Sequence, residues 1–244
     1  MRLLFVFVLV LAIIAVLYAT NPVRCAGPYL SFTLDDGYID HYSAGFPIFK
    51  KYNMTATAYI PSQLVGTIFE NNTLMGWDQI KELKSAGWEI GSHSTKHKDL
   101  SELNSTDIDL EMASSKEDFR KNGIIAETLA VPYGRYNSLI KEASKKYFIG
   151  TRPSEWGYNN LQSMDKYSLK SFWATNRTSL KEMIGWMSSG NRLDLWTIIM
   201  IHFVRQNISD EYTITPQYLN SLLSYIKSTN LKVKTVSDVI KLCK

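Results

Sequence analysis

Residues 29–37 read Tyr-Leu-Ser-Phe-Thr-Leu-Asp-Asp-Gly. The first six residues are mostly aromatic, aliphatic or β-branched, a composition that favours a buried strand. Two adjacent carboxylates and a glycine follow at once, and such a cluster is typical of a turn. We therefore predict a first strand from Tyr29 to Leu34, with Asp35 and Asp36 at its carboxyl end.

From this strand onward, short apolar runs alternate with amphipathic stretches to the end of the chain. Further strands are predicted over residues 56–60, 88–92, 128–131, 147–151, 196–201 and 231–236. Helices are predicted over residues 39–52 (kinked at Pro47), 77–85, 106–122, 138–146, 180–187 and 216–228, with a last helix up to Cys243. Repeated strand-helix alternation without a linker or repeat indicates one α/β domain over residues 27–244, with a parallel sheet that is open or closed into a barrel.

Composition and charge narrow the class of protein. The chain has 244 residues, of which 45% are hydrophobic and 20% charged, so we expect one globular core rather than a disordered chain. Its formal net charge is +4, and without Arg2 and Arg24 in residues 1–26 it would be 4 − 2 = +2. This weak charge gives no reason to expect a nucleic-acid partner. We expect a monomer.

The amino terminus carries an export segment. An unbroken apolar run from Leu3 to Ala19 follows Arg2, a pattern typical of a hydrophobic helix that acts as a signal peptide or a membrane anchor. No clear cleavage site of two small residues separated by one is present, which favours an uncleaved anchor. We therefore expect residues 1–26 to contact the membrane and the domain to lie outside the cytoplasm, secreted or anchored.

The only two cysteines, Cys25 and Cys243, flank the predicted domain. Export would place them where thiols oxidise, and the termini of a compact domain often lie close together, so a bridge between them is one interpretation. Two unrelated thiols are an equally good one. The chain also contains Asn-x-Ser/Thr acceptor sequences, at Asn53, Asn71, Asn104, Asn176 and Asn207.

Three of the four histidines fall at predicted strand ends, where parallel α/β proteins bind ligands. His93 and His97 are four residues apart, a spacing that would bring two imidazoles to one side of a helical turn, where they can share a metal. His202 ends the apolar strand Ile-Ile-Met-Ile-His. His41 is the exception, because it lies within a predicted helix.

Two imidazoles and one carboxylate suit a divalent metal with an open coordination position, such as catalytic Zn²⁺. The same ligands also suit non-haem Fe²⁺, and their identity leaves Co²⁺ and Ni²⁺ open. A second carboxylate beside the ligand and a separate His202 would supply a general base and a general acid. These groups favour hydrolysis over oxygen chemistry.

Four short motifs occur in one order along the chain: Thr-Leu-Asp-Asp-Gly at 33–37, His-Ser-Thr-Lys-His at 93–97, Ala-Val-Pro-Tyr-Gly at 130–134 and Met-Ile-His at 200–202. Together they resemble the motifs of the NodB-homology polysaccharide deacetylases, also called carbohydrate esterase family four. The resemblance extends from about Tyr29 to Cys243. It implies a distorted, incomplete (β/α) barrel of about seven parallel strands.

The resemblance also implies roles for residues. Asp36, His93 and His97 would bind the metal, and Asp35 would be the general base. The assignment of the two aspartates comes from the resemblance alone, because neighbours on a strand point in opposite directions. His202 would protonate the departing amine, and the backbone N–H of Tyr133 would stabilise the oxyanion.

The substrate implied is an acetylated glycan that contains N-acetylglucosamine, and removal of its acetyl groups would occur at the cell surface. The particular glycan stays open, since many polymers carry the same acetamide.

Two departures from the family pattern leave alternatives open. Ala130 stands where many members have an arginine that pairs with the base, and we predict that Arg152 replaces it. The acidic residue that usually tunes the catalytic histidine has only Glu155, beside Trp156, as a near match. The chain could therefore be a sugar-binding homologue with weakened catalysis, or an amide hydrolase acting on compounds other than sugars. Trp156, Tyr158 and Trp173 could stack on sugar rings, or belong to the core.

Overall fold

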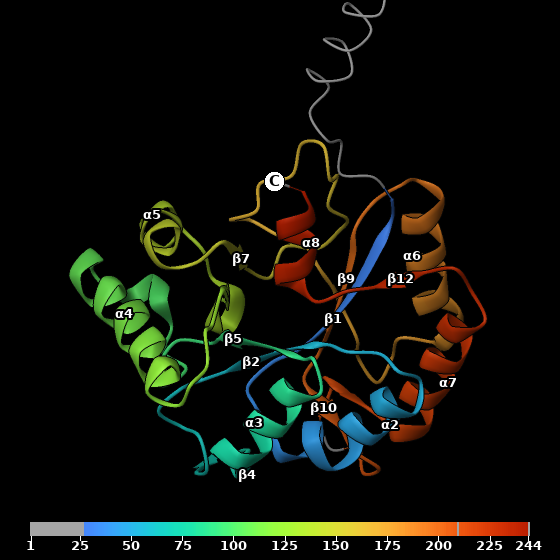
Figure 1. The fold of residues 1–244 in the computed structure, drawn as a ribbon, viewed down its shortest axis with the longest axis horizontal. Coiled ribbons are helices and arrows are strands. Elements are labelled where there is room, and N and C mark those ends of the chain that lie inside the picture. The colour runs from blue at the N-terminus through green and yellow to red at the C-terminus, as the bar shows by residue number, and fades with distance from the viewer. Residues whose placement is uncertain (1–26, 209, 244) are drawn as a thin grey trace, which may run out of the picture.

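The computed structural model describes residues 27–208 and 210–243, and a curved parallel sheet forms its centre (Figure 1). The strand order is β7-β6-β5-β2-β1-β9-β8, and the short strand β12 also pairs with β1. The bounds are Tyr29–Leu34 (β1), Thr57–Ile60 (β2), Glu89–Ser92 (β5), Thr128–Ala130 (β6), Gly150–Arg152 (β7), Phe172–Trp173 (β8), Thr197–Ile201 (β9) and Lys232–Val233 (β12).

Every pairing within this sheet is parallel, and within the described ranges β7 and β8, at the two ends of the order, do not pair with each other. The predicted distorted, incomplete barrel of about seven parallel strands is therefore confirmed. Helices surround the sheet in Figure 1. They are Phe46–Lys51 (α2), Trp77–Ser85 (α3), Ser105–Lys121 (α4), Ser138–Tyr147 (α5), Leu180–Arg192 (α6), Pro216–Lys227 (α7) and Val236–Leu242 (α8).

Strand β1 is central because its sequence is apolar enough to be buried on both faces. All six of its residues are buried, and it pairs with β2, β9 and β12. A parallel strand that neighbours cover on both faces reads as a near-continuous apolar run, as this one does. The residues that follow β1 therefore emerge at the middle of the sheet.

The predicted helix over residues 39–52 is present and runs without a break over residues 39–51. Residues His41–Gly45 form a single π-helical turn (η1), and α2 begins directly after it at Phe46. Pro47 stands next to the point where the hydrogen bonding changes from π-helical to α-helical. Because proline has no N–H, it cannot donate to the turn before it, and the change in helix type lies beside the predicted kink.

Three small β elements were not predicted: β8, the antiparallel hairpin of Ile68–Phe69 (β3) and Asn72–Thr73 (β4), and the parallel pair of Phe203–Val204 (β10) and Thr213–Ile214 (β11). All are strands of two residues, too short to show a period. In the hairpin turn Glu70 has φ 47° and Asn71 has φ 62°, the conformation of a type I′ turn, which normally takes glycine.

The predicted signal peptide or anchor at residues 1–26 lies outside the described residues. Among the residues that are described, none of the helices combines the length and the hydropathy needed to cross a bilayer. Cys243 is disulfide-bonded; Cys25, its partner in one of the two interpretations above, lies outside the described residues.

Candidate metal centre and active site

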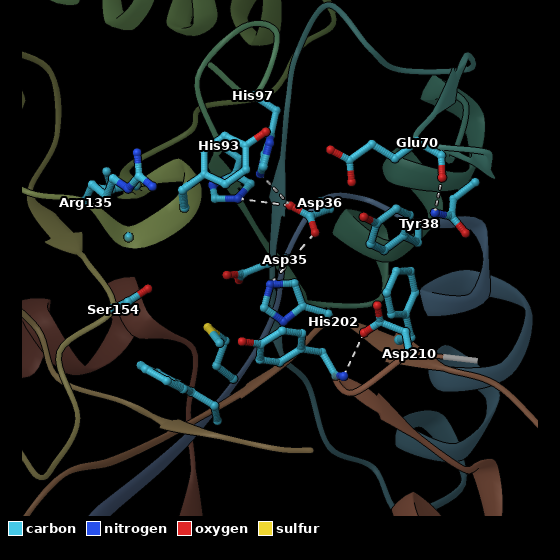
Figure 2. Close-up of a pocket in the computed structure, with 18 residues that line it drawn as sticks. Asp35, Asp36, Tyr38, Glu70, His93, His97, Arg135, Ser154, His202 and Asp210 are labelled. Atoms are coloured by element: carbon cyan, nitrogen blue, oxygen red, sulfur yellow. Dashed lines mark hydrogen bonds and ion pairs between the residues drawn. The ribbon is translucent and has the colours of Figure 1, made fainter. Parts of the chain in front are cut away.

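Three of the predicted site residues form a compact cluster at the carboxyl ends of β1 and β5 (Figure 2). Asp36 Oδ1 lies 3.2 Å from His93 Nε2 and 3.0 Å from His97 Nε2. All three residues are buried, and one ligand atom from each falls within 4.8 Å of the others. This is a possible site for one metal ion.

The backbone that presents these ligands is unusual. Asp36 has φ 75°, Ser94 has φ 60° and His97 has φ 54°, all in the left-handed region that non-glycine residues rarely adopt. The expectation that His93 and His97 share a helical turn is therefore wrong. A loop with two left-handed residues turns His97 back toward His93 instead. Such strain at a cluster of polar groups is typical of functional sites.

The hydrogen-bond partners and charges of these three side chains fit a bound cation. His93 Nδ1 donates to the carbonyl oxygen of Ala130 at 2.8 Å, which leaves the lone pair of Nε2 facing Asp36, as in protein metal sites. Asp36 Oδ1 is buried without a hydrogen-bond partner. Burial acts to raise the pKa of Asp36, but the contacts with His93 and His97 outweigh it and hold the pKa well below the usual value.

A buried carboxylate anchors the loop that carries the two histidines. Glu111 on α4 accepts hydrogen bonds from the backbone N–H of Thr95, at 3.2 Å, and from its hydroxyl. Its second oxygen lies 2.9 Å from the ammonium of Lys98. Both partners flank His97, so Glu111 fixes the loop from behind the metal cluster. Sequence reasoning missed this residue, since a glutamate in an amphipathic helix carries no signal of such a contact.

Asp35 lines the same pocket as the metal cluster and pairs with Arg152. The guanidinium of Arg152 donates from Nη2 to Asp35 Oδ2, and the arginine is only 1% exposed. Arg152 on β7 is the register partner of Ala130 on β6. The structure thus places a cation from the neighbouring strand beside Asp35, at the position where Ala130 offers none.

His202 lies on the opposite side of Asp36 from the histidine pair (Figure 2), with Nε2 at 3.9 Å from Asp36 Oδ2. Its ring packs against Tyr212, with centroids 5.1 Å apart. Its Nδ1 is buried and has no hydrogen-bond partner among the described residues. Glu155, the nearest sequence match to the missing acidic partner, pairs with Lys170 at 2.8 Å instead.

These groups share one pocket of about 590 Å³ that Asp35, Asp36, His93, His97 and His202 all line. Tyr133 forms part of the rim, with 55% of its surface exposed, and its ring packs on His97 with centroids 4.6 Å apart. Trp173 lines the pocket and Trp156 packs beside Trp173. Residues that sequence reasoning missed complete the wall: Tyr38, Glu70, Asn72, Arg135, Ser154, Asp210 and Tyr212.

The fold and the site define a class: a parallel half-barrel with a possible three-ligand metal centre and a carboxylate-arginine pair at the carboxyl ends of its strands. Comparison with known proteins then gives the family. A sequence model described as polysaccharide deacetylase matches residues 24–149. The chain belongs to the polysaccharide deacetylase family.

Individual relatives agree with this. A chitin deacetylase of Arthroderma benhamiae is 36% identical over 124 residues, which cover 49% of this chain and 32% of the relative. A poly-beta-1,6-N-acetyl-D-glucosamine N-deacetylase of Staphylococcus aureus is 30% identical over 124 residues, 43% of this chain and 42% of the relative. The chain thus spans less than half the length of these curated relatives.

Among solved structures, the Streptococcus pyogenes deacetylase PplD in complex with acetate is 25% identical. It superposes with a TM-score of 0.59, covering 64% of this chain and 69% of that one.

Proposed function

We propose that this chain is a metal-dependent hydrolase that removes N-acetyl groups from glycans containing N-acetylglucosamine. The observation that carries the proposal is the convergence of Asp36, His93 and His97 with the Asp35–Arg152 pair and His202 in one pocket. The family of the chain and the substrates for which its relatives are named support the choice of substrate.

In this proposal Asp36, His93 and His97 hold the metal. A divalent cation there supplies Lewis acidity and lowers the pKa of a water molecule. Zn²⁺ is the preferred ion on ligand type, with Co²⁺, Ni²⁺ and Fe²⁺ as the other ions to test.

Asp35 is the general base in the proposed mechanism. Its carboxylate takes a proton from the attacking water, and Arg152 fixes its orientation. His202 then gives a proton to the nitrogen of the departing amine, which breaks the amide bond and releases acetate. The backbone N–H of Tyr133 donates a hydrogen bond to the oxyanion.

The pocket supports a saccharide substrate. It is open to solvent at a rim with Tyr133 and Tyr212, which are exposed, and exposed aromatic rings offer a face on which a sugar can pack. The apolar run at residues 3–19 supports a location outside the cytoplasm, secreted or held at the membrane, where such polymers occur. We propose that the protein acts as a monomer.

The test is acetate release from acetylated chito-oligomers and from poly-β-1,6-N-acetylglucosamine, by the purified full-length chain with each candidate metal. Metal analysis is carried out on the same samples. Acetate release that requires Asp35 and the metal supports the proposal, while a metal-loaded chain inactive on every acetylated glycan refutes it.

The unpartnered Nδ1 of His202 favours, as the second candidate, a glycan-binding homologue with weakened catalysis. This candidate predicts saturable binding of the same oligomers to the metal-loaded chain, with no acetate released. Release of ammonia or amine from cyclic ureides, without activity on sugars, would instead identify an amide hydrolase acting on other compounds.

A further inference from the structure

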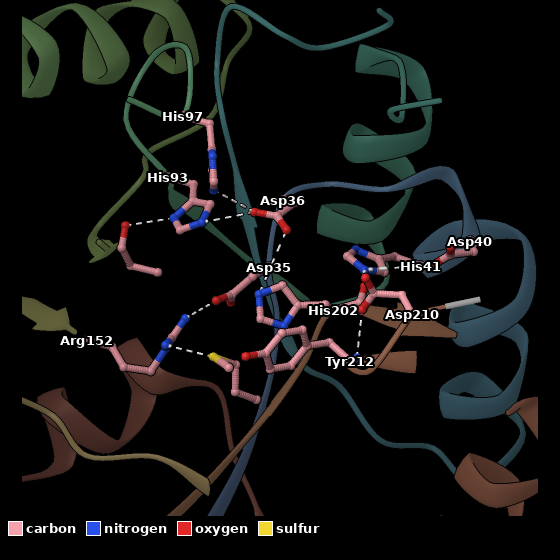
Figure 3. A network of polar contacts seen from close by, with 12 residues as sticks. Asp35, Asp36, Asp40, His41, His93, His97, Arg152, His202, Asp210 and Tyr212 are labelled. Carbon is pink, nitrogen blue, oxygen red and sulfur yellow. Dashed lines mark hydrogen bonds and ion pairs between the residues drawn. The ribbon is translucent and has the colours of Figure 1, made fainter. Parts of the chain in front are cut away.

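His41, the histidine that does not lie at a strand end, contacts the backbone of His202. It is fully buried in η1, and its Nε2 is hydrogen-bonded to the carbonyl oxygen of His202, 161 residues away in the sequence. Figure 3 shows His41 and its neighbour Asp40 beside His202, on the side away from Arg152. A buried histidine with a specific polar partner calls for an explanation, because burying an imidazole is costly.

The protonation state of His41 follows from its surroundings. Burial lowers the pKa of His41 and outweighs the opposing effect of Asp40, so the imidazole is neutral. A neutral imidazole has one N–H, and since a carbonyl oxygen can only accept, that proton lies on Nε2. His41 is therefore a fixed donor to the His202 carbonyl.

The His202 side chain makes few contacts that could fix its own orientation. Its Nδ1 has no hydrogen-bond partner among the described residues, and Tyr212 only packs against the ring. Histidines that transfer protons are normally oriented by a group bonded to the second ring nitrogen. Here the orientation has to come from the backbone that carries the ring.

Asp40 contacts the residues that follow His202 in the chain, Val204 and Arg205. Its Oδ1 accepts from the backbone N–H of Val204 at 3.2 Å, and its Oδ2 from Arg205 Nε at 2.5 Å. Arg205 in turn donates to the side chain of Asn72, in the β3–β4 hairpin, at 2.8 Å. His202, Val204 and Arg205 are thus each held by a hydrogen bond to His41 or Asp40.

We propose that His41 is a positioning residue that sets the place of the His202 ring in the pocket through its hydrogen bond to the His202 carbonyl. The proposal rests on the proposed function insofar as His202 is the proton donor to the leaving group. Asp40 completes the clamp on residues 202–205, and neither residue touches the substrate.

The experiment compares His41→Leu with His41→Gln in the full-length, metal-loaded protein. Leucine removes the donor, whereas the amide nitrogen of glutamine can stand in for Nε2. We expect His41→Leu to lower kcat by about tenfold or more, with KM within about twofold, because a misplaced proton donor weakens the transition state and not substrate binding. Metal content stays at the parent level, and His41→Gln recovers most of kcat.

The control is Trp196→Phe, which removes another buried hydrogen bond, from Trp196 Nε1 to Ser31 Oγ at 2.9 Å, next to the opposite end of β9. It is expected to lower the melting temperature without lowering kcat. Equal losses of kcat in this control and in His41→Leu would overturn the proposal. So would a His41→Leu variant with parental kcat, or a glutamine variant no better than leucine.

A readout without catalysis separates this proposal from the proposed function. The chain has four histidines, so each ring signal can be assigned by NMR from single variants. In His41→Leu the His202 signal should move while those of His93 and His97 remain in place. If the parent releases no acetate, the proposed function fails, and an unmoved His202 signal would still overturn the positioning role by itself.

Discussion

The cation beside Asp35 can be moved from one strand to the next, and this gives the sharpest prediction. Arg152 and Ala130 are register partners on β7 and β6, so their side chains project from the same face of the sheet, about 4.8 Å apart at the backbone. Arg152→Ala leaves the Asp35 carboxylate buried without its cation. The double variant Ala130→Arg/Arg152→Ala returns a guanidinium to the same carboxylate from the neighbouring strand, into the space that Arg152 vacates.

The magnitudes follow from burial. Removing one partner of a buried ion pair costs about 3–5 kcal/mol of unfolding free energy, and loss of an oriented general base costs about 10²-fold or more in kcat/KM. The double variant should recover at least about tenfold of that rate and 1–2 kcal/mol of that stability. The control is Lys170→Ala, which breaks the half-exposed pair with Glu155 and should cost less than about 1 kcal/mol.

The assays are urea unfolding, acetate release and metal analysis on all four proteins. A single Arg152→Ala variant with the parental rate, at full metal content, would refute the role of the arginine. A double variant no better than the single one would refute the argument from strand register.

Three other predictions concern the base, the metal and the histidine loop. Asp35→Asn should lower kcat by about 10²-fold or more and leave the metal bound; a variant with normal turnover, or one without metal, would contradict the roles proposed for the two aspartates. Removing the metal with a chelator should abolish acetate release and lower the melting temperature, and adding Zn²⁺ should restore both, because an ion that binds only the folded chain stabilises it; activity unchanged by exhaustive chelation would argue against a metal enzyme. Glu111→Gln should weaken Zn²⁺ binding about tenfold or more in a competition assay, and unchanged affinity would show that Thr95 does not need this anchor. The same variant has a pH signature. Burial acts to raise the pKa of Glu111, but hydrogen bonds from Thr95 and Lys98 lower it below 4.5, so its contribution to the unfolding free energy is complete above about pH 4.5 and disappears as the pH falls through the lowered value. Urea unfolding should therefore show a difference in unfolding free energy between parent and variant at pH 7 that narrows toward pH 3.

The sequence predicts the strands around the site well, because strands that run through the core leave a continuous apolar signal. Residues 29–34 and 197–201 are buried throughout. Because both runs are recognisable in the sequence, the polar residues that follow each run could be placed at one edge of the sheet. The pairing of Arg152 with Asp35 could be inferred only because Ala130 stands where the family pattern has an arginine.

What escaped prediction depends on contacts between distant segments. The hairpin at residues 68–73 has strands of two residues and a turn of Glu70 and Asn71 without glycine, so no local signal marks it. The contact of His41 with His202 spans 161 residues, and no periodicity carries that information. The helical turn expected at residues 93–97 failed because Ser94 and His97 adopt left-handed conformations, which the spacing of two histidines does not reveal.

The single π-helical turn at residues 41–45 makes the number of residues in this stretch a structural constraint of its own. Each residue of a helix rotates the chain by about 100°, and a π turn accommodates one residue more than an α turn. A deletion of one residue between Tyr42 and Gly45 would therefore convert the turn into regular α-helix and leave Phe46 and Phe49, both buried, facing the core. An insertion of one further residue would instead rotate the following helix by about 100° and turn both side chains away from the core. Natural length variation in this turn should therefore be limited to the loss of one residue, unless α2 is repacked.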